Sequence, residues 1–232
     1  MTAPDRTAPT PVPLADPDAL VAAVASRYGK ASRFAQGYVR SKLRRDPATA
    51  AILAAAEAAG GFGHLADLGC GRGQLALALL LAGRAESVAG LDLDAAKIGE
   101  AREAARGLPA CFTAADLSRA PVPASDTVML VDVLYQMPEA AQHALLGRVA
   151  AAARRRVVIR AFDPDAGWRT RVGRAMEVAN RALRGAREAS IRPLSLPALA
   201  APLTAAGFAV RVSPCWAGTP LPNVLLVAER PA

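Results

Sequence analysis

The chain has few cysteines and no recognisable export signal. Its three cysteines, Cys70, Cys111 and Cys215, are odd in number and do not show the spacing of metal ligands. Residues 1–13 are rich in proline, alanine and threonine and lack the apolar core of a signal peptide. We therefore expect a reduced, cytoplasmic setting, with neither a disulfide framework nor a cysteine metal site.

Long apolar runs and aromatic residues are also scarce. The longest obvious apolar run, Leu75–Ala82, is much shorter than the ~18 residues of a membrane span, so no transmembrane segment is expected. Aromatic residues make up 4% of the chain, and only Tyr28, Phe34 and Tyr38 interleave with its first basic segment. Their spacing suits the core face of a helix, whereas RNA-binding surfaces usually expose aromatic rings. This argues against nucleic acid as a partner.

A glycine-rich turn stands out against this background, in residues 65–73, which read LADLGCGRG. A short apolar run ends in Asp67 and then in three alternate glycines, Gly69, Gly71 and Gly73. An apolar, helix-forming stretch follows at once. Glycine has no Cβ to block a ligand and tolerates positive φ, and a helix N-terminus points free N–H groups at anionic groups. The pattern predicts a strand, a turn and a helix that together bind a ligand.

The rival for such a turn is a dinucleotide site, whose pattern is Gly-x-Gly-x-x-Gly. Here the third glycine comes one residue too soon, and Asp67 lies two residues before the first glycine. The pattern Asp-x-Gly-x-Gly-x-Gly resembles the first motif of the class I S-adenosylmethionine-dependent methyltransferases. The resemblance implies that Asp67 helps to place the methionine ammonium and that the helix start suits the methionine carboxylate. Cys70, inside this loop, is interpreted as a small packing residue beside the cofactor.

Two further acids follow the next two expected strands. Asp92, with Leu93 after it, ends the second strand, where a carboxylate can accept hydrogen bonds from ribose hydroxyls. Asp116, followed by Leu117, ends the third strand, where class I methyltransferases often carry an acid for the adenine amino group. Asp94 is instead the expected N-cap of the following helix. Three acids after three successive strands support one cofactor site.

The fourth expected strand, residues 126–132, predicts the acceptor side of the site. Its end should lie where the strand order reverses, so Asp132, Tyr135 and Gln136 are the residues expected nearest the transferred methyl group. Tyr135 and Gln136 are the candidate catalytic residues, and Asp132 is grouped with the cofactor-binding ones. Methyltransferases of base amines carry Asn/Asp-Pro-Pro-Tyr/Phe here, and both prolines are missing. Neither histidine, His64 or His143, is expected to act as a base.

The order of elements predicts an α/β fold with a doubly wound, mostly parallel seven-stranded sheet of the Rossmann-like methyltransferase type. Its last two strands are expected to form an antiparallel C-terminal hairpin, and helices are added at the N-terminus. The strands are expected near residues 64–68, 87–92, 109–114, 126–132, 156–162, 208–213 and 224–229. The expected division is a disordered leader over residues 1–18 and a single domain over 19–232. Within that domain, 19–60 form a helical cap and 167–192 a basic helical insertion.

Arginine dominates the positive charge, because only three of the 28 basic residues are lysines. Residues 27–45 hold seven basic residues and no acid, and residues 167–192 hold seven arginines against two glutamates. In the second segment Trp168, Val172 and Met176 share a helical stripe expected to cover the substrate, with the basic side outward. The segments predict either an acidic partner, such as a carrier protein, or only a compositional bias towards arginine.

The function expected from these features is methyl transfer from S-adenosylmethionine to a small or carrier-bound organic acceptor, on oxygen, carbon or nitrogen. Residues 38–47 and 167–172 also bear a faint resemblance to bacterial methyltransferases of aryl-polyene or fatty-acid-like biosynthetic systems, which implies a role in secondary metabolism. Two alternatives stay open. One is an RNA or protein methyltransferase that uses the basic face. The other is an S-adenosylmethionine-binding protein without catalysis.

Overall fold

The computed structural model describes residues 11–173, 175–176 and 192–231. The chain divides into two compact units, Met1–Ala115 and Asp116–Ala232. The sequence predicted one domain over residues 19–232, and each unit is described by itself below.

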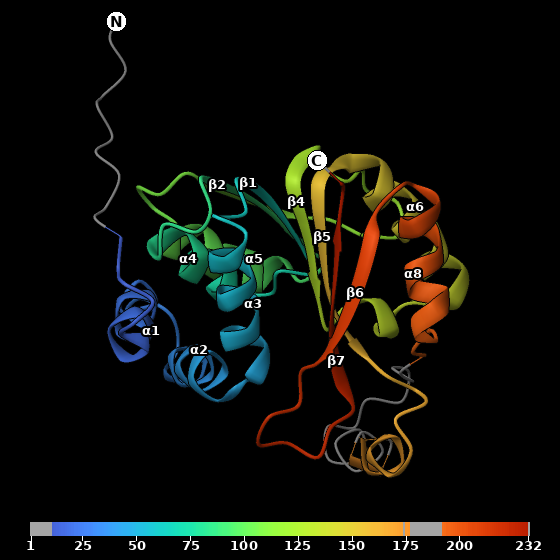
Figure 1. Cartoon of the computed structure of the whole chain (residues 1–232). Helices are drawn as coiled ribbons and strands as arrows, with labels where there is room; N and C mark the ends of the chain where they lie inside the picture. The colour runs from blue at the N-terminus through green and yellow to red at the C-terminus, as the bar shows by residue number, and fades with distance from the viewer. Residues whose placement is uncertain (1–10, 174, 177–191, 232) are drawn as a thin grey trace, which may run out of the picture. The chain divides into compact units, whose positions relative to one another are not determined.

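The first unit begins with three helices and continues with alternating strands and helices (Figure 1). Its strands are parallel and lie in the order β3-β2-β1. The elements are, in chain order, α1 (Pro17–Ser26), α2 (Arg33–Arg45), α3 (Pro47–Ala58), β1 (His64–Leu68), α4 (Gln74–Leu81), β2 (Ser87–Asp92), α5 (Ala95–Ala104) and β3 (Ala110–Ala114).

The helix boundaries of this unit follow local capping chemistry. Asp46 Oδ1 accepts a hydrogen bond from Ala48 N at 3.0 Å, and Pro47 occupies the first helical position of α3. Asp94 Oδ1 accepts from Ala96 N at 3.0 Å and so begins α5. The predicted N-cap at Asp94 is therefore confirmed, and Asp46 caps α3 in the same way. Each cap satisfies backbone donors that have no partner inside the helix.

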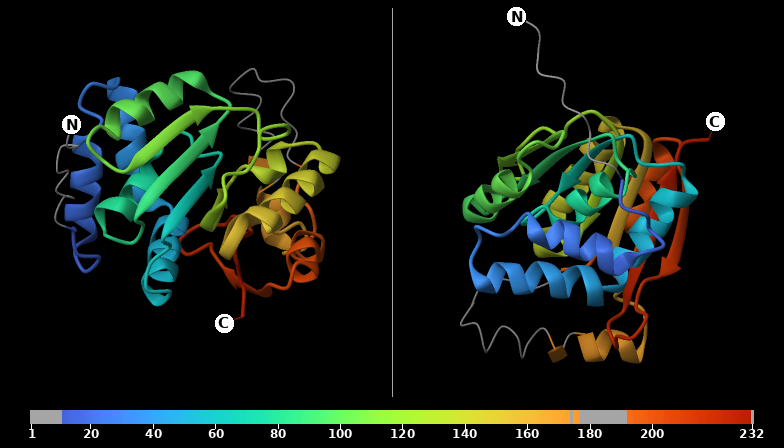
Figure 2. Two further views of the ribbon diagram at one scale, coloured as in Figure 1. Left: turned by 90° about the horizontal axis from the view of Figure 1, so that it is seen from above. Right: turned by 90° about the vertical axis from the view of Figure 1, so that its left-hand side faces the viewer.

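The N-terminal helices pack against the rest of the first unit. Helices α1 and α2 lie side by side (Figure 2), and both contact α4. The described part of the expected leader is attached as well, because Val12 N donates to Leu81 O at 2.8 Å, at the end of α4. Residues 11–16 therefore lead directly into α1, and residues 1–10 lie outside the described part of the chain.

The second unit carries the remaining strands. Its strand order is β4-β5-β7-β6, with β4 and β5 parallel and both β5–β7 and β6–β7 antiparallel. The elements are β4 (Ser125–Val131), η1 (Leu134–Gln136), α6 (Glu139–Ala152), β5 (Ala153–Phe162), α8 (Leu196–Ala205), β6 (Ala209–Pro214) and β7 (Asn223–Glu229). A further helix occupies residues 168–173, and α6 packs against α8.

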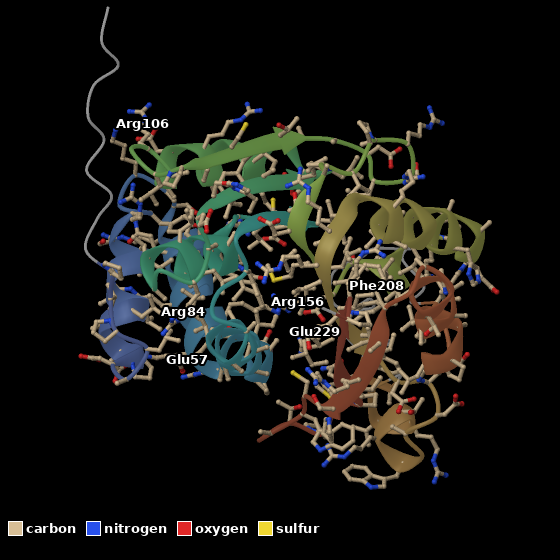
Figure 3. The ribbon with its side chains drawn as sticks, turned by 45° about the horizontal axis from the view of Figure 1, so that its top comes forward. Glu57, Arg84, Arg106, Arg156, Phe208 and Glu229 are labelled. Atoms are coloured by element: carbon tan, nitrogen blue, oxygen red, sulfur yellow. The ribbon has the colours of Figure 1, made fainter. Side chains whose placement is uncertain are left out.

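A charge cluster spans the C-terminal strands. Glu229 on β7 lies opposite Arg156 on β5, and the two side chains form an ion pair at 2.9 Å (Figure 3). Arg211 on β6 pairs with the same carboxylate at 2.6 Å. Within the described residues the chain thus has seven strands, mostly parallel, with an antiparallel C-terminal hairpin. The predicted fold class is confirmed.

The predicted packing of the aromatic residues in the first basic segment is wrong for two of the three. Tyr28 is buried, but Phe34 is 74% exposed and Tyr38 is 40% exposed on α2. The buried face of α2 is formed by Ala35 and Val39 together with Leu43. Residues 34 and 38 share a helix face, as their spacing requires, but it is the solvent face.

The described part of the second basic segment leaves two residues of the predicted stripe exposed, and its orientation towards a substrate stays a prediction. Trp168 is 56% exposed and Met176 is 42% exposed, whereas Thr170 and Gly173 are buried. Gly173 packs so closely on Phe162 that a Cβ there would lie 2.7 Å from the ring. The helix therefore turns its small residues towards the protein. Arg174 and residues 177–191, which complete the predicted stripe and its basic side, lie outside the described residues.

Candidate cofactor and acceptor sites

The glycine loop after β1 adopts the backbone geometry that its sequence predicts. Gly69, Gly71 and Gly73 have φ values of 78°, 56° and 74°, which side-chain-bearing residues rarely adopt. A Cβ on Gly73 would lie 2.7 Å from the Phe112 ring, so packing also requires glycine there. A Cβ on Gly71 would meet no atom within 4 Å. The loop is thus packed on one side and open at Gly71, where a ligand can approach the backbone.

Asp67 lies at the base of this loop and is buried, with only 3% of its surface exposed. Burial, together with the nearby Asp92 carboxylate, raises its pKa from 3.8 to about 7. Among the described residues none donates a hydrogen bond to this carboxylate. A buried acid without a donor is costly unless a ligand supplies one.

Asp92, at the end of β2, holds the loop in place. One carboxylate oxygen accepts from Gly71 N at 2.7 Å and the other from Asp94 N at 2.9 Å. Each oxygen retains a lone pair for a further donor. Leu93 beside it is exposed and offers an apolar surface next to the acid.

Gln74 is the first residue of α4 and is buried directly after the loop. Its Oε1 has no hydrogen-bond partner in the described structure. Cys70, inside the loop, is a buried free thiol. Burial and the neighbouring Asp67 raise the pKa of this thiol, which keeps it protonated and unreactive.

The N-terminal helices hold the same loop from outside, which the sequence did not predict. Tyr28 follows α1 and donates its hydroxyl to Arg72 O at 2.5 Å. The Arg72 guanidinium pairs with Glu100 of α5 at 2.5 Å and lies 5.3 Å from the centroid of the Tyr38 ring. Burial raises the pKa of Tyr28. The loop backbone is therefore fixed by α1, α2 and α5 together.

In the second unit, Asp116 and Leu117 lie just before β4. Asp116 is exposed, and hydrogen bonds from the Ser118 side chain and from Ser118 N, the latter at 2.9 Å, lower the pKa of its carboxylate. Leu117 is buried, and its carbonyl accepts from the Arg148 guanidinium. The acid is thus turned towards solvent while the leucine anchors the turn.

The end of β4 has a strained backbone at a predicted site residue. Asp132 has a φ of 59°, the only positive value outside glycine in the described residues. Arg160 Nη1 donates to Asp132 Oδ2 at 2.5 Å, and the Arg160 side chain is almost completely buried. The Gln136 side chain donates to the Asp132 carbonyl. Strain that is held by several contacts is typical of functional sites.

Tyr135 follows on η1 and packs against the end of β5. Its ring meets that of Phe162 edge-on, with centroids 6.5 Å apart. Its carbonyl accepts from Arg192 N at 2.7 Å, directly after the basic insertion. Gln142, fully buried on α6, donates to Met137 O at 2.9 Å and to Arg192 O at 2.7 Å. The turn that carries Tyr135 is thereby clamped between α6 and the end of the insertion.

Part of the chain, including the glycine loop, matches a known protein family. Residues 65–156 match the family described as Methyltransferase domain. The match includes the glycine loop, Asp92, Asp116 and the whole of β4. The predicted resemblance to methyltransferases is confirmed for this segment.

Solved structures similar to this chain show the same fold. Magnesium protoporphyrin IX methyltransferase from Synechocystis PCC 6803 is 21% identical, with a TM-score of 0.61 over 93% of this chain and 96% of that one. An O-methyltransferase family protein from Burkholderia thailandensis is 19% identical, with a TM-score of 0.63 over 89% and 62%. The N-methyltransferase NodS from Bradyrhizobium japonicum WM9 is 13% identical, with a TM-score of 0.60 over 92% and 99%. A search of curated proteins found no match.

The predicted site residues of the chain fall into two local groups. In the first unit Asp67, the glycine loop and Asp92 with Leu93 lie together at the ends of β1 and β2. In the second unit Asp132, Tyr135 and Gln136 lie together after β4, whereas Asp116 and Leu117 precede it. Their roles in binding and catalysis stay predictions.

Sequence reasoning missed the partners of these residues. Gln142 gave no signal because a glutamine on a helix is ordinarily a surface residue. Arg160 gave no signal for its pairing because its partner Asp132 lies 28 positions earlier in the chain.

The two histidines of the chain lie at the start of β1 and on α6. His64 starts β1, and its Nδ1 lies 2.7 Å from Ser87 Oγ, while His143 is half-exposed on α6. Among the described residues no cluster of His, Cys, Asp or Glu has the makings of a metal site. In the same part of the chain no helix combines the length and apolar character needed to cross a bilayer.

Proposed function

We propose that the chain transfers a methyl group from S-adenosylmethionine to a small organic acceptor. The observation that carries this proposal is Asp67, a buried carboxylate beside the glycine loop to which no described residue donates a hydrogen bond. An ammonium group is the partner that such an acid requires. The methionine end of S-adenosylmethionine has an ammonium group.

The residues present fit this cofactor. Asp67 would accept a hydrogen bond from the methionine ammonium. The open side of Gly71 would leave room for the ligand beside the loop backbone. The N-terminus of α4 favours the methionine carboxylate through its free N–H groups. Asp92 has a remaining lone pair on each oxygen for the ribose hydroxyls, and the exposed Leu93 supplies an apolar contact for the base.

Bound S-adenosylmethionine supplies a methyl group on a positively charged sulfur, with a good leaving group already present. The protein then contributes mainly alignment and exclusion of water. Tyr135 would hydrogen-bond the acceptor atom through its hydroxyl, and Gln136 and Arg160 would fix the backbone and carboxylate of Asp132 beside it. No histidine is required for this role.

The acceptor class is proposed from the printed names of structural neighbours. These include a methyltransferase of magnesium protoporphyrin IX and a pyocyanin biosynthetic protein, both of which concern small organic molecules. Other neighbours were crystallised with S-adenosylmethionine or S-adenosylhomocysteine bound. We place the acceptor among small or carrier-bound compounds of secondary metabolism, and the reaction in the cytoplasm.

Calorimetric titration with S-adenosylmethionine and with NAD tests the cofactor. Only the first should bind, and Asp67→Asn should weaken it by about 1.5–3 kcal/mol, the scale of a hydrogen bond to a charged group. Binding should also strengthen as the pH rises through about 7, because Asp67 must lose its proton to pair with an ammonium. The control is Asp94→Asn, which removes a helix-capping carboxylate from the neighbouring turn. Tighter binding of NAD would contradict the proposal.

A further inference from the structure

Helix α2 presents an aromatic ridge to solvent. Phe34 is 74% exposed and Tyr38 is 40% exposed, and their four-residue separation places them on one face of the helix. Gly37 and Ser41, also exposed, lie on the same face. Two exposed rings that are adjacent on one helix face form a patch, and apolar patches rimmed by polar residues mark interaction sites.

Arginines without acidic partners flank this ridge. Arg33, Arg40 and Arg45 are exposed and make no ion pair among the described residues. The other basic groups nearby are already used: Lys30 pairs with Glu103, Arg44 pairs with Asp18, and Arg27 donates to the carbonyls that end α5. The positive charge left over is therefore concentrated on the exposed side of α2.

We propose that this surface of α2, formed by Phe34, Tyr38, Arg33, Arg40 and Arg45, binds an anionic lipid bilayer. Interfacial helices combine aromatic side chains that enter the headgroup region with arginines that contact lipid phosphates. The aromatic ridge and the three arginines match both requirements. Attachment is peripheral and reversible, because the helix is short and carries only two exposed aromatic rings.

The same geometry favours a bilayer over nucleic acid. Bases stack on free ring faces within a groove that follows the phosphate backbone. One face of Tyr38 is covered by the Arg72 guanidinium, and a helix presents a convex surface. An acidic protein would need an apolar pocket for Phe34 as well as acids for the arginines, whereas an anionic bilayer supplies both an apolar layer and phosphates.

The location of the surface links attachment to the cofactor site. Helix α2 contacts α4, and Tyr38 stacks on Arg72 within the glycine loop. A bilayer bound at α2 therefore lies next to the loop. An amphipathic acceptor dissolved in that bilayer would reach the protein without crossing water.

Sedimentation with lipid vesicles tests this inference on the full-length chain. Vesicles of phosphatidylcholine mixed with phosphatidylglycerol should bind the protein, and vesicles of phosphatidylcholine alone should not. Binding should fall as salt rises past ~0.1 M, where the Debye length is about 10 Å. Two variants divide the contributions: R33E/R40E should abolish binding, and Phe34→Ser should weaken it about tenfold or more.

The matched control is R154E/R155E, which makes the same charge change on two exposed arginines of β5. It should bind vesicles much better than R33E/R40E. Equal losses in both variants would show that only net charge matters and would overturn the inference. So would unchanged binding of Phe34→Ser, or binding to a single-stranded oligoribonucleotide without binding to vesicles. Cofactor titration of each variant separates these outcomes from a failure of the proposed reaction.

Discussion

At the scale of single residues, Asp67 is an acid held where water hardly reaches it. Its burial and the Asp92 carboxylate oppose ionisation, so its pKa is about 7 in the folded chain instead of 3.8. Below about pH 4 the acid is protonated in both the folded and the unfolded states. Between about pH 4 and 7 only the unfolded state releases the proton, so the free energy of unfolding falls as the pH rises.

Asp67→Asn should remove this pH dependence. The amide has nearly the same shape and carries no charge, so the variant should gain stability relative to the natural chain as the pH rises. The gain between about pH 5 and about pH 8 should be on the order of 2 kcal/mol, the equivalent of the remaining pKa difference. Urea unfolding of both proteins at the two pH values measures it. A stability difference that stays constant with pH would show that Asp67 ionises normally.

Asp132 combines a strained backbone with a buried ion pair to Arg160. Asp132→Ala should destabilise the chain by about 3–5 kcal/mol because Arg160 is left buried without its carboxylate. Asp132→Asn should be milder by about 1 kcal/mol, since asparagine tolerates a positive φ better than alanine. Urea unfolding measures both. The control is Asp18→Asn, which breaks the exposed pair with Arg44 and should change stability by less than about 1 kcal/mol.

At the scale of single elements, substitution by alanine should have opposite effects on stability at two glycines, one in β2 and one in α5. A Cβ on Gly90, in β2, would lie 2.3 Å from the Phe112 ring, so Gly90→Ala should destabilise the chain by about 1–3 kcal/mol. Gly99, inside α5, has open space around its Cβ position, so Gly99→Ala should stabilise it by about 0.5–1 kcal/mol. Thermal unfolding of the two variants decides this. Destabilisation by both would mean that α5 packs more tightly than the structure shows.

The turn that carries Tyr135 depends on the side chain of Gln142. Gln142→Leu removes the side-chain donor to Met137 O and Arg192 O, so both carbonyls lose this hydrogen bond. The free energy of unfolding should fall by about 1–3 kcal/mol, and the kcat for methyl transfer should fall while cofactor affinity stays the same. His143→Leu, on the exposed side of the same helix, is the matched control and should change neither. An equal loss of cofactor affinity would make Gln142 a general packing residue.

Most elements were predictable because their boundaries are encoded locally. Asp46 and Asp94 cap their helices through backbone groups two or three residues away, and the glycine loop requires positive φ at alternate positions. The faces of helices are less local. On α2 both the pair Phe34 and Tyr38 and the pair Ala35 and Val39 have the spacing of a buried stripe. The prediction that the aromatic pair is buried was wrong, because the smaller residues allow α2 to pack more closely.

At the scale of the whole molecule, the contacts that sequence reasoning missed join distant positions. Tyr28 reaches Arg72 over 44 positions, and Gln142 reaches Arg192 over 50. Neither pair leaves a periodic or spacing signal, since a hydrogen bond to a backbone carbonyl requires no particular residue on the accepting side. The nearness of Asp67 and Asp92 was predictable because β1 and β2 are parallel and bring their carboxyl ends to one edge.

The two local groups of site residues predict separate defects in binding and in reaction. Asp92→Ala, in the first unit, should weaken S-adenosylmethionine binding by about 1.5–3 kcal/mol, or roughly 10- to 150-fold, because it removes the proposed ribose acceptor and releases Gly71 N.

Tyr135→Phe, in the second unit, should leave that affinity unchanged. It should lower kcat/KM for the acceptor by about 0.5–1.5 kcal/mol, the value of one neutral hydrogen bond. The edge-on contact with Phe162 is retained in this variant, so packing is held constant. Calorimetry measures cofactor affinity and kinetics measure kcat/KM for the acceptor, in each single variant and in the double variant. The double variant should show the sum of the two single effects. Full activity of Tyr135→Phe would identify Tyr135 as a packing residue, and unchanged cofactor binding of Asp92→Ala would remove Asp92 from the site.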